Sequence, residues 1–197
     1  MASMNYIDKI LKIAKSNNGV VTSRGISREG IQRRALTECV VQGKLTKGGR
    51  GIYFLTNQLE DEFVIWQYTY PQGIFSGNTA LYLLQKTDLI PYSFEMTFPK
   101  GYNVTAAKLN NIKCKTVITE NFELGLMNVL TPFGNQVRCY NIERTLCDVV
   151  RGGDQQIINQ VFKSYVKSIS RDIVLLMEYA KKLRVEKKIR QYLEILL

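Results

Sequence analysis

The chain has 197 residues, enough for one large domain or two small ones that bury a core without metals or disulfides. Its apolar fraction of 45% and charged fraction of 22% are ordinary for a globular protein, and no apolar run is long enough for a membrane span. The net charge of +10 favours an anionic partner, and the absence of histidine makes most hydrolase mechanisms improbable.

The first thirty residues predict two helices. Apolar residues between Tyr6 and Ala14 recur at three- and four-residue intervals, with lysines on the other side, as in an amphipathic helix that ends before Gly19. Thr22 is a good N-cap for a second helix that runs to about residue 29, with Ile26 facing inward.

A third helix follows a tight turn, in which we expect Gly30 to take a positive φ. Its apolar side is predicted to hold Ile31, Ala35, Cys39 and Val40, with Leu36 at the edge. Four polar side chains near its start suit base edges in a major groove: Gln32, Arg33, Arg34 and Thr37. The alternative is an ordinary solvated helix face.

Residues 44–55 predict a basic hairpin whose turn is Gly48-Gly49. The cations expected to position a DNA backbone, on the second helix and on this hairpin, are Arg24, Arg28, Lys44, Lys47 and Arg50. Residues 1–56 hold ten Lys or Arg against three Asp or Glu, a net charge of +7. The order of elements therefore predicts a winged helix-turn-helix domain over residues 1–56, and the alternative is a hairpin that only closes a small core.

Residues 57–197 predict a second domain of mixed strands and helices, so the expected class is α+β. A helix with Leu59, Phe63 and Trp66 is expected to continue out of the hairpin, and Ser76 is expected to cap the next one. Strand-like patterns cover 94–98, 114–119, 126–130 and 136–139. Helices are predicted at 142–150, capped by Asn141, then from Asp154, from Ser170 and over 184–197.

The last 47 residues carry a net charge of +5, whereas residues 57–150 carry −2. The cations that could lie along DNA flanking the site are Lys181, Lys182, Lys187, Lys188 and Arg190. An outer helix face that is merely basic remains an equal alternative.

Several short motifs at matching spacing resemble AbiEi-family antitoxins. In the first domain they are Gly19-Val20-Val21-Thr22, Gly30-Ile31, Gln42-Gly43-Lys44-Leu45 and Arg50-Gly51-Ile52-Tyr53-Phe54-Leu55. In the second they are Ser76-Gly77-Asn78-Thr79-Ala80-Leu81-Tyr82, Ile90-Pro91, Thr97-Phe98-Pro99-Lys100 and Ile142-Glu143-Arg144-Thr145-Leu146-Cys147-Asp148. One departure is Gly25, which stands where a better helix former is expected.

The resemblance implies a type IV antitoxin of a bacterial toxin-antitoxin system for abortive infection, that is, phage defence. Such a protein represses its own operon by binding inverted repeats in the promoter, and it counters a nucleotidyltransferase toxin without a stable complex. We expect a monomer in solution and two copies on double-stranded DNA. The alternative is a protein-interaction module that binds the toxin or another acidic partner directly.

An enzymatic second domain is disfavoured. A restriction-endonuclease-like site needs an Asp and then a Glu-x-Lys, but Asp88 and Glu95 are followed by Thr97 in place of the lysine. Glu143 and Asp148 lie about 140° apart around one predicted helix, where ion pairs with Arg144 or Arg151 are expected instead of a shared ion. We therefore expect no enzyme, no metal and no cofactor.

The cysteines and the N-terminus predict a cytoplasmic protein. Cys39, Cys114, Cys139 and Cys147 form no CxxC pair, so we expect inert reduced thiols. The start of the chain lacks a secretory signal, and residues 1–3, ahead of a second methionine, look like an expression remnant.

Overall fold

The protein folds into two compact units of mixed helix and strand. The computed structural model describes residues 6–196, so the expected expression remnant at residues 1–3 lies outside it. One unit comprises Met1–Pro71 with Leu130–Gln136, and the other comprises Gln72–Val129 with Val137–Leu197. The helices and strands of both units confirm the predicted α+β class.

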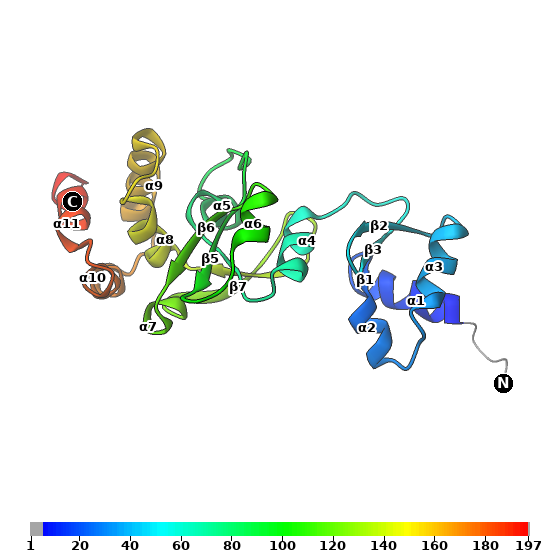
Figure 1. The fold of residues 1–197 in the computed structure, drawn as a ribbon. Coiled ribbons are helices and arrows are strands. Elements are labelled where there is room, and N and C mark those ends of the chain that lie inside the picture. The colour runs from blue at the N-terminus through cyan, green and yellow to red at the C-terminus, as the bar shows by residue number, and fades with distance from the viewer. Residues whose placement is uncertain (1–5, 197) are drawn as a thin grey trace. The chain divides into compact units, whose positions relative to one another are not determined.

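The first unit contains a three-stranded antiparallel sheet in the order β1-β3-β2 (Figure 1). Its elements are α1 (Tyr6–Ser16), β1 (Val20–Thr22), α2 (Ser23–Arg28), α3 (Arg34–Val41), β2 (Leu45–Gly49), β3 (Ile52–Leu55) and α4 (Glu62–Thr69). A shared core joins α1, α2 and α3 to the sheet. Three helices followed by a two-stranded hairpin up to Leu55 occur in the predicted order, whereas the short strand β1 was not predicted.

Local signals place the first two helices correctly. The Thr22 side chain accepts a hydrogen bond from the Gly25 amide at 3.0 Å, and Ile26 is fully buried. Gly30 has a φ of +71°, which a residue without a Cβ adopts without strain. The chain can therefore turn sharply into the segment before α3.

The third helix differs from the prediction in its start and in its buried side. It begins at Arg34, so Gln32 and Arg33 precede it. Leu36 is completely buried, whereas Val40 is half-buried. Leu36 faces the core because α3 packs against both α1 and β2, and two neighbours require a wider apolar stripe than one.

The hairpin turn lies two residues later than predicted. Gly48 and Gly49 belong to β2, with a register shift between Lys47 and Gly49, and Gly51 in the turn has a φ of +78°. A Cβ on Gly48 would lie 2.2 Å from the Phe54 ring. The two glycines thus leave room for the side chains packed beside the strand, and Arg50 and Gly51 form the turn instead.

Helix α4 extends the first unit beyond residue 56, where the sequence placed the domain boundary. The helix begins after Asp61, whose carboxylate accepts hydrogen bonds from the Phe63 and Val64 amides, and the exposed Leu59 lies outside it. Apolar side chains of α4 pack against β1 and β3; the residues in contact are Val64, Ile65 and Tyr68 with Val20, Ile52 and Phe54. This apolar contact makes α4 part of the first unit.

The second unit contains a five-stranded mixed sheet in the order β6-β5-β4-β8-β7. Strand β4 pairs with β5 antiparallel and with β8 parallel, and β5 pairs with β6 parallel. The strands are β4 (Ile74–Phe75), β5 (Glu95–Pro99), β6 (Lys113–Val117), β7 (Leu126–Leu130) and β8 (Gln136–Tyr140). The helices are α5 (Gly77–Leu83), α6 (Thr105–Leu109), α7 (Thr119–Phe122), α8 (Ile142–Val149), α9 (Gln155–Lys167), α10 (Ile173–Lys182) and α11 (Glu186–Leu196).

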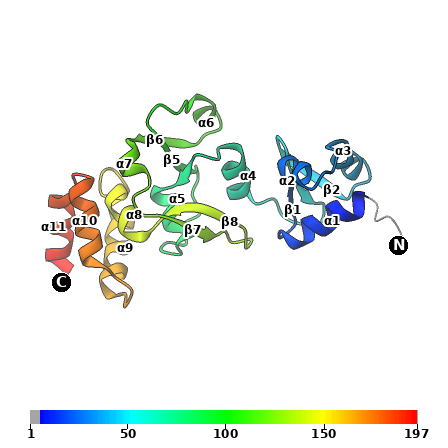
Figure 2. The same cartoon turned by 90° about the horizontal axis from the view of Figure 1, so that it is seen from below.

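Helices α8 to α11 share one hydrophobic core, which Leu81 of α5 joins, and they lie next to one another (Figure 2). Asn141 and Asp154 cap α8 and α9 as predicted. Helix α10 is capped by Asp172 and not by the predicted Ser170, because Asp172 is the side chain that reaches the Leu175 amide.

The hydroxyl of Ser76 does not cap α5. It accepts a hydrogen bond from the Thr97 hydroxyl of β5 at 2.9 Å, although Ser76 directly precedes the helix. The predicted cap is therefore wrong in its side-chain contact and correct in its position. The hydroxyl instead joins two segments of the buried sheet.

Candidate nucleic-acid interface

The polar side chains predicted to meet base edges all face solvent. Gln32, Arg33, Arg34 and Thr37 are exposed, and the Arg34 side chain is 86% exposed. Neither arginine packs inward. The short segment before α3 and the first turns of that helix therefore present amide, guanidinium and hydroxyl donors together.

Two contacts orient the arginines. Arg33 donates from Nε to the Ser27 hydroxyl of α2 at 3.3 Å, and Arg34 pairs through Nε with Glu38 at 3.3 Å. The terminal amino groups of a guanidinium, which extend furthest from the backbone, are not the atoms used in these bonds. Each arginine can therefore be held by the protein while its outer edge meets an acceptor.

Helix α2 and the hairpin turn lie beside each other. The Ser23 amide donates to the Gly51 carbonyl at 2.8 Å, which joins the start of α2 to the turn that holds Arg50. Arg24 and Arg28 are exposed on the same helix. The structure thus brings four segments of the predicted interface together: the start of α3, both ends of α2 and the hairpin turn.

Two of the predicted phosphate contacts lie elsewhere. The Lys44 amide donates to the Cys39 carbonyl, so Lys44 follows the C-terminal end of α3, about 12 Å of helix away from Arg34. Lys47 pairs with Tyr53 within the sheet and does not flank the turn as expected, because the turn is displaced to Arg50 and Gly51. Both lysines remain exposed.

Residues 6–56 carry an excess of positive charge. Its exposed Lys and Arg side chains between residues 6 and 56 are Lys9, Lys12, Lys15, Arg24, Arg28, Arg33, Arg34, Lys44, Lys47 and Arg50. Three acidic residues oppose these ten over the same range. Such an excess of positive charge attracts polyanions at long range, and this attraction weakens with added salt.

The basic residues near the C-terminus are partly engaged within their own unit. Lys182 pairs with Glu178 at 2.7 Å and Arg190 with Glu186 at 2.8 Å. Lys188 donates to the Val150 carbonyl at 3.1 Å. The other two predicted flanking cations, Lys181 and Lys187, are exposed. This group therefore offers less unpaired charge than its sequence indicates.

Three of the four acidic residues considered for catalysis make structural contacts, and the fourth, Asp88, is exposed. Asp148 pairs with Arg144 at 3.0 Å, one of the expected ion pairs, whereas Glu143 accepts a hydrogen bond from the Tyr165 hydroxyl at 3.1 Å instead of pairing with Arg144. Glu95 accepts a hydrogen bond from the Asn78 amide. Within residues 6–196 no group of three or more Cys, Asp or Glu side chains is arranged to hold a metal ion.

All four cysteines are free thiols, and three of them are buried. Burial raises the pKa of both the Cys139 and the Cys147 thiol to about 12. It also raises the pKa of Cys39 and of the half-buried Cys114. Because the thiolate is the reactive form, these surroundings suppress thiol chemistry near neutral pH.

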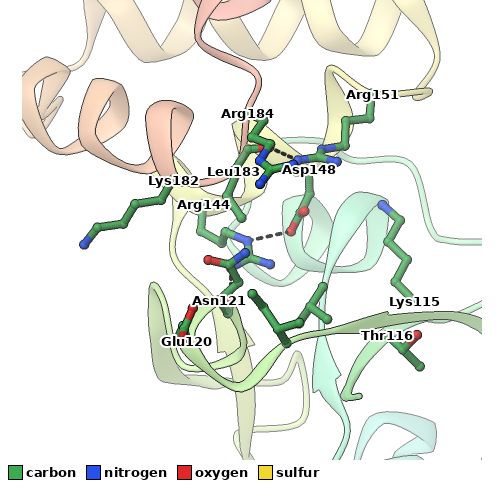
Figure 3. Close-up of a pocket in the computed structure, with 12 residues that line it drawn as sticks. Lys115, Thr116, Glu120, Asn121, Arg144, Asp148, Arg151, Lys182, Leu183 and Arg184 are labelled. Atoms are coloured by element: carbon green, nitrogen blue, oxygen red, sulfur yellow. Dashed lines mark hydrogen bonds and ion pairs between the residues drawn. The ribbon is translucent and has the colours of Figure 1, made fainter. Parts of the chain in front are cut away.

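Sequence reasoning missed a cationic cleft in the second unit, shown in Figure 3. Its side chains come from β6, α8 and the end of α10, between 29 and 40 residues apart at Lys115, Arg144 and Arg184. No local spacing connects such positions. The available signal was Arg144 itself, one of three charged residues in the predicted helix at 142–150.

No family model and no curated protein sequence matches this chain. Among solved structures, the crystal structure of the RV2827C protein from Mycobacterium tuberculosis aligns with a TM-score of 0.45 and 11% sequence identity. That alignment covers 90% of this chain and 75% of the other. Of the helices between residues 6 and 196, none has the length and apolar character to cross a membrane.

Proposed function

We propose that the protein is a DNA-binding antitoxin that represses its own operon. The observation that carries this proposal is the outward display of Gln32, Arg33, Arg34 and Thr37 at the start of α3, next to α2 and the hairpin turn. In this proposal residues 6–55 act as a winged helix-turn-helix, and the protein binds inverted repeats in its promoter with two copies on the duplex.

The proposed contacts divide into two groups. The start of α3 enters the major groove, where Arg33 and Arg34 pair with guanine edges and Gln32 with adenine. Arg24, Arg28 and Arg50 bind phosphates on either side and fix the position of the helix. The first group supplies sequence preference, and the second supplies affinity for any duplex.

The antitoxin role rests on the motifs that resemble AbiEi-family proteins, above all the segment from Ile142 to Asp148. In this proposal the chain is a cytoplasmic, non-enzymatic protein that counters a nucleotidyltransferase toxin without a stable complex. The buried contacts of Glu143, Arg144 and Asp148 are compatible with a structural role for that segment. Toxin rescue in cells, with and without Arg33→Ala, separates neutralisation from repression.

Electrophoretic mobility shift with the upstream promoter and a scrambled duplex tests DNA recognition. We expect Arg33→Ala to weaken promoter binding by about 1 to 3 kcal/mol and to relax base preference, because a bidentate base contact is lost. Arg50→Ala should weaken both duplexes alike, because it removes a proposed phosphate contact. Arg171→Ala, which removes an exposed arginine from the second unit, is the matched control and should change neither. Equal competition by promoter and scrambled DNA would refute the repressor proposal.

The second candidate is a protein-interaction module for an acidic partner such as the toxin. Val41 is 83% exposed and lies close in sequence to the exposed Lys44, and an apolar side chain next to a cation suits a protein surface better than a phosphate backbone. Co-purification with the toxin that is lost in Val41→Ser, together with unselective DNA binding, would favour this candidate.

A further inference from the structure

The cationic cleft of the second unit has no part in the proposed DNA contacts. It has a volume of about 870 Å³ and lies between β6, α8 and the C-terminal end of α10. Its cationic lining consists of Lys115, Arg144, Arg151, Lys182 and Arg184, against the two carboxylates Glu120 and Asp148. The excess of positive charge means that an anion is the ligand class that the cleft favours.

Arg144 is the buried member of this set, with a side chain that is 0% exposed. Its Nε donates to Asp148 at 3.0 Å, and its Nη1 donates to the backbone carbonyls of Asn121 and Leu124. The guanidinium carbon lies 4.3 Å from the centre of the Tyr140 ring. These contacts fix the guanidinium plane and so fix the direction of its remaining donors.

The remaining nitrogen of Arg144 is the observation that points to a ligand. Among the residues that the structure describes, its Nη2 is buried and has no hydrogen-bond acceptor, although Arg144 lines the cleft. A buried donor without an acceptor is unfavourable, and a charged donor more so. An anionic oxygen bound in the cleft would satisfy it.

Other cations of the cleft come from different segments. Lys115 is exposed on β6 and extends toward the side on which Asp148 and Arg151 lie (Figure 3). Arg151 donates to the Leu183 carbonyl, which holds its guanidinium at the rim, and Arg184 is exposed at the end of α10. Lys182 is directed to Glu178 and contributes less.

We propose that this cleft binds a small compound that carries a diphosphate group. The guanidinium groups of Arg144 and Arg151 and the ammonium group of Lys115 can donate to the several oxygens of a diphosphate. The multiple negative charge of the diphosphate also suits the excess of cations in the cleft. A duplex backbone fits less well, because it stays on the protein surface whereas the Arg144 donor is buried. The site is independent of the proposed DNA contacts of the first unit.

Isothermal titration calorimetry of the full chain with pyrophosphate at low ionic strength tests the site. We expect saturable binding that Lys115→Ala weakens about tenfold, as for the loss of one charge-assisted contact. Lys167→Ala removes an exposed lysine of α9 outside the cleft and should leave the affinity within about twofold. Equal weakening by both variants, or no saturable binding, overturns the proposal.

Nuclear magnetic resonance of arginine-labelled protein provides the second readout and needs no buried substitution. Pyrophosphate should shift the side-chain signals of Arg144 and Arg151 and leave those of Arg33 and Arg34 in place. Shifts confined to Arg33 and Arg34 overturn the proposal and leave the DNA-binding proposal standing. If duplex DNA displaces pyrophosphate from Arg144, the cleft binds nucleic acid and the small-ligand proposal is wrong.

Discussion

Two arginines with the same spacing to an acidic residue lie in opposite surroundings. Arg34 pairs with Glu38 on α3 at 3.3 Å, and Arg144 pairs with Asp148 on α8 at 3.0 Å, each four residues along the helix. The side chains of the first pair are 86% and 50% exposed, and those of the second are 0% and 9% exposed. The same i, i+4 spacing therefore occurs once in an exposed ion pair and once in a buried one.

The difference lies in what surrounds each helix. Helix α8 packs against α5, α9 and α10, so its charged side chains lose water and must find partners within the protein. Helix α3 packs against α1 and β2 only through its apolar side. The ion pair of α3 therefore lies on an exposed surface, whereas the ion pair of α8 is a buried structural contact.

The largest expected effect is the loss of the buried pair. Arg144→Ala should lower the free energy of unfolding by about 3–5 kcal/mol, because Asp148 would remain as a buried charge without its partner. Urea denaturation followed by far-ultraviolet circular dichroism measures the loss. Arg34→Ala is the matched control. A loss for Arg144→Ala no larger than that of the control would contradict the contrast between the pairs.

The next largest effect is a loss of folding stability at alkaline pH that comes from the Cys147 thiol. Because the pKa of Cys147 is raised to about 12, the folded protein keeps the thiol proton at a pH where the unfolded chain, with a pKa near 9, loses it. The stabilisation is complete below pH 9 and declines between pH 9 and 12, by about 1 kcal/mol at pH 10.

Cys147→Ala should remove this decline, so the unfolding free energies of variant and parent converge as the pH rises from 8 to 10. Cys114→Ala removes a half-buried thiol and serves as the control, with a smaller change in slope expected. Parallel pH profiles for the parent and Cys147→Ala would contradict the prediction.

The smallest effect on stability is expected at the exposed pair. Arg34→Ala should cost about 0.3–0.5 kcal/mol of unfolding free energy, as for other solvent-exposed helix pairs, and yet weaken DNA binding. Glu38→Gln should cost as little and strengthen binding to every duplex, because it removes a negative charge from the same surface. The expected result is weaker DNA binding for Arg34→Ala and stronger DNA binding for Glu38→Gln, with the unfolding free energy nearly unchanged in both.

The sequence predicted those parts of the fold that depend on neighbours a few residues away. Thr22, Asn141 and Asp154 cap their helices as expected, and Gly30 turns the chain as expected. The predicted cap at Ser170 was wrong by two residues, because Asp172 is the residue whose side chain accepts from the Leu175 amide. Local chemistry thus restricts a helix start to a few residues without selecting one.

The exposure of the proposed interface residues was predicted better than their arrangement. The exposure of Arg34 follows from the amphipathic pattern of α3, because apolar positions nearby fix which side faces the core. The position of Lys47 could not be predicted from the sequence pattern. Gly48 lies in β2 against Phe54, so the turn comes after Gly49 and Lys47 pairs with Tyr53 within the sheet. Register depends on that contact between strands.

The sequence by itself determined the distribution of charge along the chain and the helix caps at Thr22, Asn141 and Asp154, since these depend on residue type and on neighbours a few residues away. Only the tertiary structure decided that Arg144 is buried, that Gly48 lies in a strand, and that cations from three distant segments share one cleft. The physical reason is that burial and contact depend on which segments pack together, and those segments are far apart along the chain.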